Sequence, residues 1–180
     1  MRRYLQRADD IIYTQIDCED WNDEMKKPIY HGIFFDKDDI ASYKEHLGID
    51  TPSLPDVIEN PHVTFGFRVE PVDGFDELFV PYTDSDGLVL IVGYGNDGGN
   101  EGFLVRIDSE IAGFYQGQVY GRDENRNIYA HITISYDRAS GRKPVDTGSI
   151  DFDMLDGYPL TTFGDFGYFD GKRIHYYKDE

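Results

Sequence analysis

The chain has 180 residues and a formal net charge of −18, from 35 acidic and 17 basic side chains. Hydrophobic residues make up 39% of the sequence and aromatic residues 15%, a composition typical of a folded domain. This acidity argues against binding to long duplex nucleic acid, because such binding depends on Lys and Arg side chains that neutralise many phosphates. Any phosphate-bearing substrate is therefore expected to be small.

The sequence excludes further classes of protein. No apolar run approaches the length of a membrane span, so no membrane partner is expected. Residues 1–7 lack the apolar segment of a secretory signal, and the single Cys18 excludes an internal disulfide and a cysteine-based zinc site. We therefore expect a cytoplasmic protein. The 19 glycines and 8 prolines indicate many turns and favour a β-rich fold.

The first part of the chain is predicted to form a helix and a linker. Apolar residues recur at helical spacing over residues 4–16, whereas residues 18–27 are charged and irregular. We therefore divide the chain into an N-terminal helix and linker, residues 1–27, and a single domain, residues 28–180. The second part is long enough to bury one hydrophobic core.

A strand and a helix are predicted at the start of the domain. Residues 28–35 have the composition of a strand. Asp36 or Asp38 can cap the helix that follows, which ends at Gly48. Residues 49–61 contain several prolines and are expected to form a loop.

The middle of the chain contains a Gly-x-Gly-x-x-Gly match at Gly93, Gly95 and Gly98. A dinucleotide-binding site of this type needs a strand before the motif and a helix after it. Apolar runs at residues 88–93 and 103–107 flank the glycines, so a second strand follows instead of a helix. We therefore interpret the segment as the turn of a β-hairpin.

The second half is predicted to contain a strand, a polar loop and a hairpin, at residues 127–136, 138–148 and 161–177. The first arm of the hairpin is residues 161–169, and its turn lies near Asp170. Residues 111–120 are ambiguous, because two glycines weaken both a helix and a strand there.

Two of the predicted strands carry the same pattern, a histidine followed two positions later by a threonine. The two copies are His62-Val63-Thr64-Phe65 and His131-Ile132-Thr133-Ile134. Because side chains alternate between the two faces of a strand, each histidine shares a face with its threonine, and the apolar residues point to the other face. We expect the apolar faces to pack on a core and the fold to bring the two motif strands together.

These residue types suit the cleavage of a phosphodiester. The reaction needs one proton taken from the nucleophile and one given to the leaving oxygen, and imidazole does both because its ordinary pKa is about 6.5. A threonine hydroxyl on the same face can donate to a non-bridging phosphate oxygen. Tyr129 shares the face of His131 and is a candidate to stack on a nucleobase. The pattern does not decide which histidine is the base.

Two His-hydrophobic-Thr-hydrophobic strands in a small α+β chain resemble the 2H phosphoesterase superfamily, which includes 2′,3′-cyclic phosphodiesterases and RNA ligase-associated cyclic phosphodiesterases. The resemblance covers roughly residues 28–177. It implies an α+β, two-lobed fold in which mainly antiparallel sheets, with a few helices, flank a central cleft. It also implies that His62 and His131 are the acid/base pair and that Thr64 and Thr133 contact the phosphate.

The resemblance implies a hydrolase that needs neither a metal nor another cofactor. Its substrate would be a small nucleotide or RNA end with a 2′,3′-cyclic phosphate, or a cyclic mono- or oligonucleotide. Two histidines could instead hold a metal, but neither motif has a carboxylate at a matching position. Two other interpretations stay open: a non-catalytic module of the same fold that binds a nucleotide or a protein, and a β-rich structural protein with incidental histidines.

Overall fold

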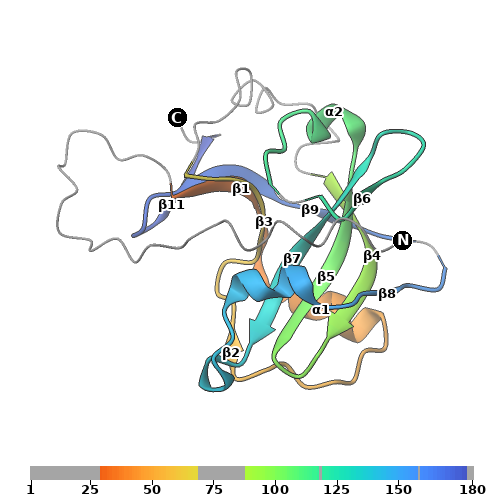
Figure 1. Cartoon of the computed structure of the whole chain (residues 1–180), viewed down its shortest axis with the longest axis vertical. Coiled ribbons are helices and arrows are strands. Elements are labelled where there is room, and N and C mark those ends of the chain that lie inside the picture. Colours follow the sequence, from red (N-terminus) through yellow and green to blue (C-terminus); the bar gives the residue numbers. More distant parts are fainter. Residues whose placement is uncertain (1–28, 69–87, 118, 158, 178–180) are drawn as a thin grey trace.

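The computed structural model describes residues 29–68, 88–117, 119–157 and 159–177. Within these ranges the chain is an α+β fold of two antiparallel sheets with a few short helices (Figure 1), which confirms the predicted class at this level. The helix predicted over residues 4–16 and the linker over residues 18–27 lie outside the described residues. No helix in the described ranges is long and apolar enough to cross a membrane.

The smaller sheet has the strand order β11-β10-β1-β3, and all neighbouring strands are antiparallel. Its strands are β1 (Tyr30–Phe34), β3 (His62–Phe67), β10 (Asp165–Phe169) and β11 (Ile174–Tyr176). β1 lies within the strand predicted over residues 28–35. β3 carries the first histidine–threonine motif and lies at one edge of the small sheet, so one side of its backbone can pair with another segment.

The larger sheet has the strand order β2-β7-β5-β4-β8, with β6 paired to β7 and β9 paired to β4. Its strands are β2 (Asp56–Val57), β4 (Leu88–Asn96), β5 (Asn100–Ile107), β6 (Gly121–Arg122), β7 (Ile128–Tyr136), β8 (Asp153–Met154) and β9 (Leu160–Phe163). β7 carries the second motif. The glycine-rich stretch joins β4 to β5, which confirms the predicted hairpin turn and excludes the dinucleotide motif.

The helices are α1 (Lys37–His46), α2 (Ser109–Ala112) and the 3₁₀ helices η3 (Arg138–Ser140) and η4 (Pro144–Ser149). α1 confirms the predicted helix: the Asp36 carboxylate accepts a hydrogen bond from the backbone N–H of Asp38 at 2.7 Å, and Gly48 follows the helix with a φ of 67°. The loop predicted over residues 138–148 was wrong in part, because two 3₁₀ turns form there.

Both sheets and α1 share one hydrophobic core. On each motif strand the residues on either side of the motif threonine or histidine belong to this core. They are Val63 and Phe65 on β3 and Ala130 and Ile132 on β7. Phe65 and Ile132 are fully buried, and burial of such a side chain stabilises the fold by about 1.5–3 kcal/mol. The core therefore occupies the apolar face of each motif strand and leaves the histidine face on the opposite side.

The prediction that residues 161–169 form one strand, the first arm of a hairpin, was wrong. The chain crosses from the large sheet to the small sheet at Gly164, so that β9 pairs with β4 whereas β10 pairs with β1. A Cβ at Gly164 would lie 2.5 Å from the carbonyl oxygen of Phe34, so only glycine fits at this crossing. The turn near Asp170 is as predicted, between β10 and β11.

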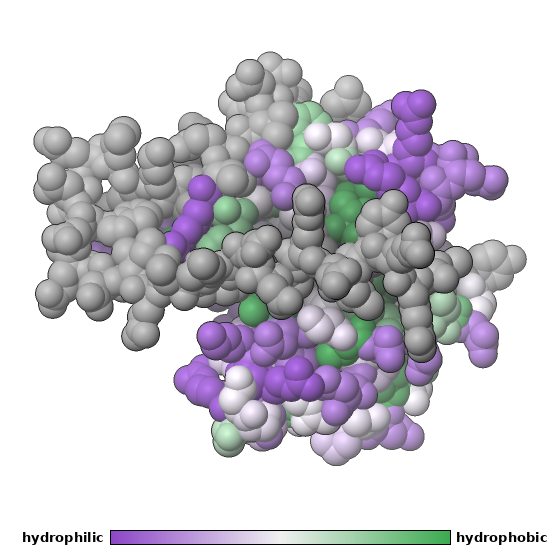
Figure 2. Space-filling model, in the orientation of Figure 1, coloured by the Kyte–Doolittle hydropathy of each residue, from purple (hydrophilic) through white to green (hydrophobic). Residues whose placement is uncertain are grey.

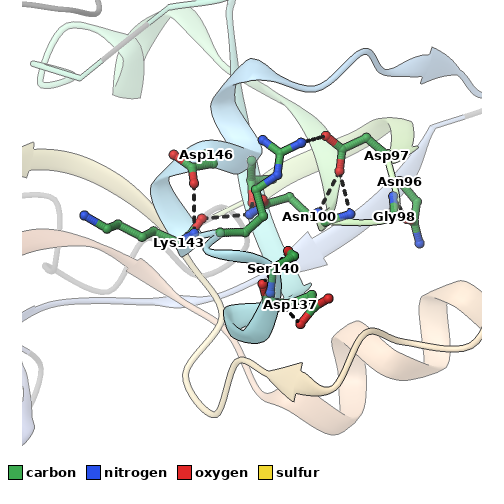
Figure 3. A network of polar contacts seen from close by, with 11 residues as sticks. Asn96, Asp97, Gly98, Asn100, Asp137, Ser140, Lys143 and Asp146 are labelled. Atoms are coloured by element: carbon green, nitrogen blue, oxygen red, sulfur yellow. Dashed lines mark hydrogen bonds and ion pairs between the residues drawn. The ribbon is translucent and has the colours of Figure 1, made fainter.

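The turn between β4 and β5 is fixed against the segment that holds η3 and η4 (Figure 3). The Asp97 carboxylate accepts hydrogen bonds from the backbone N–H groups of Gly99 and Asn100 at 2.8 and 2.7 Å. The same carboxylate pairs with Arg142 at 2.6 Å, and the Asn100 side chain donates to the Lys143 carbonyl at 2.8 Å. These contacts hold η4 against β5 and β7.

Candidate functional site

His62 lies at the start of β3, on the face of the small sheet opposite the core. The half-buried imidazole is stacked on the Tyr30 ring with centroids 4.5 Å apart, and the Phe34 ring is 5.4 Å away. Its Nδ1 lies 2.7 Å from the carbonyl oxygen of Asn60. Because a carbonyl oxygen only accepts, Nδ1 carries the proton of the neutral ring, and Nε2 presents its lone pair.

His131 lies in the middle of β7, on the face of the large sheet opposite the core. Its Nδ1 is 2.7 Å from the hydroxyl of Tyr120. The Tyr120 ring meets the imidazole edge-on, with centroids 5.6 Å apart, and meets Phe152 in the same way at 6.1 Å. Burial raises the pKa of the Tyr120 phenol, so the hydroxyl keeps its proton and can donate to Nδ1 or accept from it.

The two histidines lie close enough to influence each other's charge. Burial, and to a smaller extent the charge of His62, lowers the pKa of His131 to about 4. Burial also lowers the pKa of His62, opposed by the hydrogen bond to Asn60. β3 and β7 contact each other as well, although they belong to different sheets. At neutral pH both imidazoles are therefore uncharged in the free protein.

The segment from α2 to β6, here called the connector, joins the two sheets beside the histidines. The backbone N–H of Gln116 donates to the Phe65 carbonyl of β3 at 2.7 Å. The backbone N–H of Tyr120 donates to the Tyr129 carbonyl of β7 at 2.9 Å. The Tyr115 ring meets Phe65 edge-on, with centroids 5.3 Å apart. The connector therefore fixes β3 relative to β7.

The two motif threonines have different surroundings. Thr64 is half-buried on β3, and its hydroxyl makes no hydrogen bond with the described part of the chain. Thr133 is only 9% exposed, because η4 covers this part of β7, and its hydroxyl donates to the Pro144 carbonyl at 3.1 Å. With respect to the described residues, Thr64 is thus free to donate to a ligand, whereas Thr133 already has a partner.

Tyr129 is half-buried on β7, between the core residues Ile128 and Ala130 in sequence. Strand alternation therefore places it on the face that carries His131. Within the described ranges its hydroxyl makes no hydrogen bond. Two further aromatic residues are buried: Phe103 is in the core, and Phe34 lies next to His62.

Sequence reasoning missed three tyrosines of this site. Tyr30 covers one side of the His62 ring, Tyr120 holds the His131 ring, and Tyr115 lies close enough to Tyr120 that its charge raises the Tyr120 pKa. Tyr30 could have been found, because it lies four positions before Phe34 on a predicted strand, and residues four apart on a strand share a face. Tyr115 and Tyr120 could not be assigned a face, because both lie in the ambiguous stretch 111–120.

Among the described residues, no group of three or more His, Cys, Asp or Glu side chains is placed to hold a metal ion. The chain matches no model of a known protein family, no curated protein and no solved structure. What supports a function is therefore the chemistry and the geometry of the site itself.

Proposed function

We propose that the protein is a metal-independent phosphodiesterase of the 2H type, with the two sheets as its lobes and the two histidine faces lining a central cleft. The substrate is a small nucleotide or RNA end with a 2′,3′-cyclic phosphate, or a cyclic mono- or oligonucleotide. One observation carries this proposal: His62 and His131 come from different sheets, both lie opposite the core, and the charge of one acts on the other.

In this proposal the two imidazoles divide the proton transfers. Nε2 of neutral His62 takes a proton from the attacking water, whose oxygen forms the new bond to phosphorus. Protonated His131 gives a proton to the leaving oxygen as its bond to phosphorus breaks. The product is a phosphomonoester, and exchange of protons with solvent restores the starting state of both rings.

The proton on His131 has to be favoured by the substrate, because His131 is neutral in the free protein at neutral pH. A phosphodiester anion next to the ring raises its pKa, since a nearby negative charge stabilises imidazolium. Tyr120 suits both states of the ring: its hydroxyl can donate to Nδ1 of neutral imidazole and accept from Nδ1–H of imidazolium.

The remaining groups of the site suit a nucleotide. The Thr64 hydroxyl, which has no hydrogen-bond partner among the described residues, is the better donor to a phosphate oxygen, because the Thr133 proton is held by Pro144. Aromatic rings lie beside both histidines, with Tyr30 and Phe34 next to His62. Such rings can stack on nucleobases, at about 1–3 kcal/mol for each base. The charge of −18 favours a small substrate over a long nucleic acid.

Turnover of a panel of nucleotides in the presence of EDTA tests the proposal. The panel contains 2′,3′-cyclic and 3′,5′-cyclic nucleotides, cyclic dinucleotides and RNA ending in a 2′,3′-cyclic phosphate. We expect EDTA to leave turnover unchanged and His62→Ala or His131→Ala to reduce it by about 10²–10⁴-fold. His46→Ala is the matched control, because His46 is exposed on α1.

Unchanged turnover in either variant would refute the role of that histidine, provided that circular dichroism shows an intact fold. Binding of a nucleotide without turnover by the wild-type protein, across the whole panel, would favour the non-catalytic module instead.

A further inference from the structure

A concave site lies between α2 and the β6–β7 hairpin. It is a cavity of about 390 Å³, and its lining includes Ser109, Glu110, Tyr115, Arg122 and Arg126. Arg122 pairs in register with Ile128, a core residue of β7, so the cavity lies on the core side of that strand, opposite the face of His131. A cavity of this size can hold a ligand as large as a mononucleotide.

Two arginines, Arg122 and Arg126, line this cavity. Within the described ranges neither Arg122 nor Arg126 forms an ion pair. Four other described cations each form one, namely Lys37, Lys44, Arg138 and Arg142, whereas the remaining described lysines and arginines form none with the described residues. Figure 2 shows hydrophilic residues gathered over the β6–β7 hairpin, at the upper right. The lining of the cavity thus carries two guanidinium groups and one carboxylate, that of Glu110.

Two acidic residues, Asp123 and Glu124, lie between the arginines in the chain, and Asp123 has its own hydrogen-bond partners. The Asp123 carboxylate accepts hydrogen bonds from the backbone N–H groups of Asn125 and Asn127, at 2.9 and 3.0 Å, and from the Asn127 side chain at 2.9 Å. These bonds close the β6–β7 turn. Asp123 thus shapes the hairpin that carries the arginines, and within the described ranges it forms no ion pair with either of them.

The two walls of the cavity are held together by Asn127, whose side-chain oxygen accepts a hydrogen bond from the Ser109 backbone N–H at 3.0 Å. Asn127 is only 6% exposed, so this link between α2 and the hairpin is shielded from water. Arg126 has a φ of 66°, a left-handed conformation that costs free energy for a residue other than glycine. The turn therefore holds Arg126 in a conformation that its own backbone disfavours.

We propose that this cavity is a second ligand site, which binds a nucleoside monophosphate. Arg122 and Arg126 bind the phosphate, as guanidinium groups do in bidentate geometry. The Glu110 carboxylate repels further phosphates and accepts hydrogen bonds from ribose hydroxyls, which selects a monophosphate over a polyphosphate. Tyr115 supplies an aromatic wall. The two arginines lie on the opposite side of β7 from His131, so this site is distinct from the proposed catalytic pair, although Tyr115 borders both.

Calorimetric titration with adenosine 5′-monophosphate, adenosine and inorganic phosphate tests this site. We expect adenosine 5′-monophosphate to bind at least about tenfold more tightly than adenosine, and inorganic phosphate to compete with it. The variant Arg122→Gln/Arg126→Asn should weaken binding of the monophosphate by at least about tenfold. Asparagine is chosen at position 126 because it tolerates a left-handed backbone.

Two further variants of the protein serve as controls. Lys37→Gln/Lys172→Gln removes the same charge from exposed positions elsewhere and should bind as the wild type does. His62→Ala/His131→Ala should also bind normally, whereas loss of binding there would place the nucleotide at the histidines and overturn the proposal. Equal affinities for adenosine and its monophosphate, no binding at millimolar concentration, or normal binding by the folded arginine variant would each overturn it. Single Arg122→Gln repeats the test should the double variant fail to fold.

Discussion

The hydroxyl of Tyr120 lies 2.7 Å from Nδ1 of His131. The connector places it there, because its backbone donates a hydrogen bond first to β3, from Gln116, and then to β7, from Tyr120. The corresponding atom of His62 faces the carbonyl of Asn60, which can only accept a hydrogen bond. The tautomer of neutral His62 is thereby fixed. The phenol, in contrast, can serve both the neutral and the protonated form of His131, and this difference separates the roles of the two rings.

Replacing Tyr120 by phenylalanine should therefore change proton transfer more than binding. Without the hydroxyl, Nδ1 of the buried His131 has no partner, and imidazolium becomes less stable relative to the neutral ring. We expect kcat to fall by about tenfold and its alkaline limb to move to lower pH, with KM nearly unchanged. Tyr129→Phe is the control, since no hydrogen bond within the described ranges involves its hydroxyl. A pH profile of Tyr120→Phe that overlays the wild type would remove Tyr120 from the mechanism.

The lowered pKa values of both histidines predict an acidic optimum for kcat/KM. The active free protein holds one proton on the pair, and this proton is lost as pH rises above the pKa of the more basic ring, which lies below 6.5. Above that pH, kcat/KM should fall about tenfold for each pH unit. Below about 4, His131 is protonated together with His62, and activity falls again.

The pH profile of kcat should be shifted to higher pH than the pH profile of kcat/KM. Bound phosphodiester raises the pKa of the neighbouring imidazoles, so the alkaline limb of kcat lies at higher pH. Profiles measured from pH 4 to pH 9 at constant ionic strength check both statements. An alkaline limb of kcat/KM above pH 7 would show that the free protein does not hold its histidines as described.

Periodicity was sufficient to predict the parts of the fold that local sequence determines. Alternation identified the core face of both motif strands, and the Asp36 cap and Gly48 set the ends of α1. The glycine-rich hairpin followed from the absence of a helix after the glycines. In each case the residues that decide the structure are neighbours along the chain.

Features that depend on distant residues could not be predicted. The crossing at Gly164 needs the backbone of Phe34, which comes from another part of the chain. The burial of Thr133 needs η4, which is held over β7 by Asn100 and the turn around Asp97. Tyr120 acquires its role from the hydrogen bonds of the connector to two sheets. No local pattern carries this information.

The different surroundings of the two motif threonines predict different effects when each is changed to valine. Thr64→Val removes a hydroxyl that has no partner in the described part of the chain, so it should lower kcat/KM by about tenfold or more, with little effect on stability. Thr133→Val leaves the buried Pro144 carbonyl without its donor, so it should destabilise the fold by about 1–3 kcal/mol and change kcat/KM less. Urea unfolding and steady-state kinetics separate the two effects. Equal losses of activity without loss of stability would mean that both hydroxyls contact the phosphate.

The β10–β11 hairpin should lose stability in acid through Asp170. Its hydrogen bond to His175, at 2.8 Å, and further bonds from the backbone N–H groups of Arg173 and Lys172 hold the pKa of Asp170 well below its usual range. A depressed carboxyl pKa stabilises the fold above the ordinary value near 3.8, and this stabilisation is lost as pH falls below it. Asp170→Asn should therefore cost roughly 1 kcal/mol at pH 7 and progressively less below pH 4. A pH-independent cost would contradict this account.

Lys44 is a buried cation whose removal should destabilise the protein strongly. Lys44 on α1 pairs with the fully buried Glu101 of β5, and the Glu101 carboxylate also accepts hydrogen bonds from Tyr94 at 2.8 Å and from Ser135. Lys44→Met leaves Glu101 as an uncompensated charge in the interior, which should cost about 3–5 kcal/mol in urea unfolding. Lys44→Met/Glu101→Gln removes both charges, and glutamine keeps an oxygen that accepts from Tyr94 or Ser135. The double variant should therefore be more stable than Lys44→Met alone. If it is less stable, the cost of Lys44→Met comes from lost packing of α1 and not from the unpaired carboxylate.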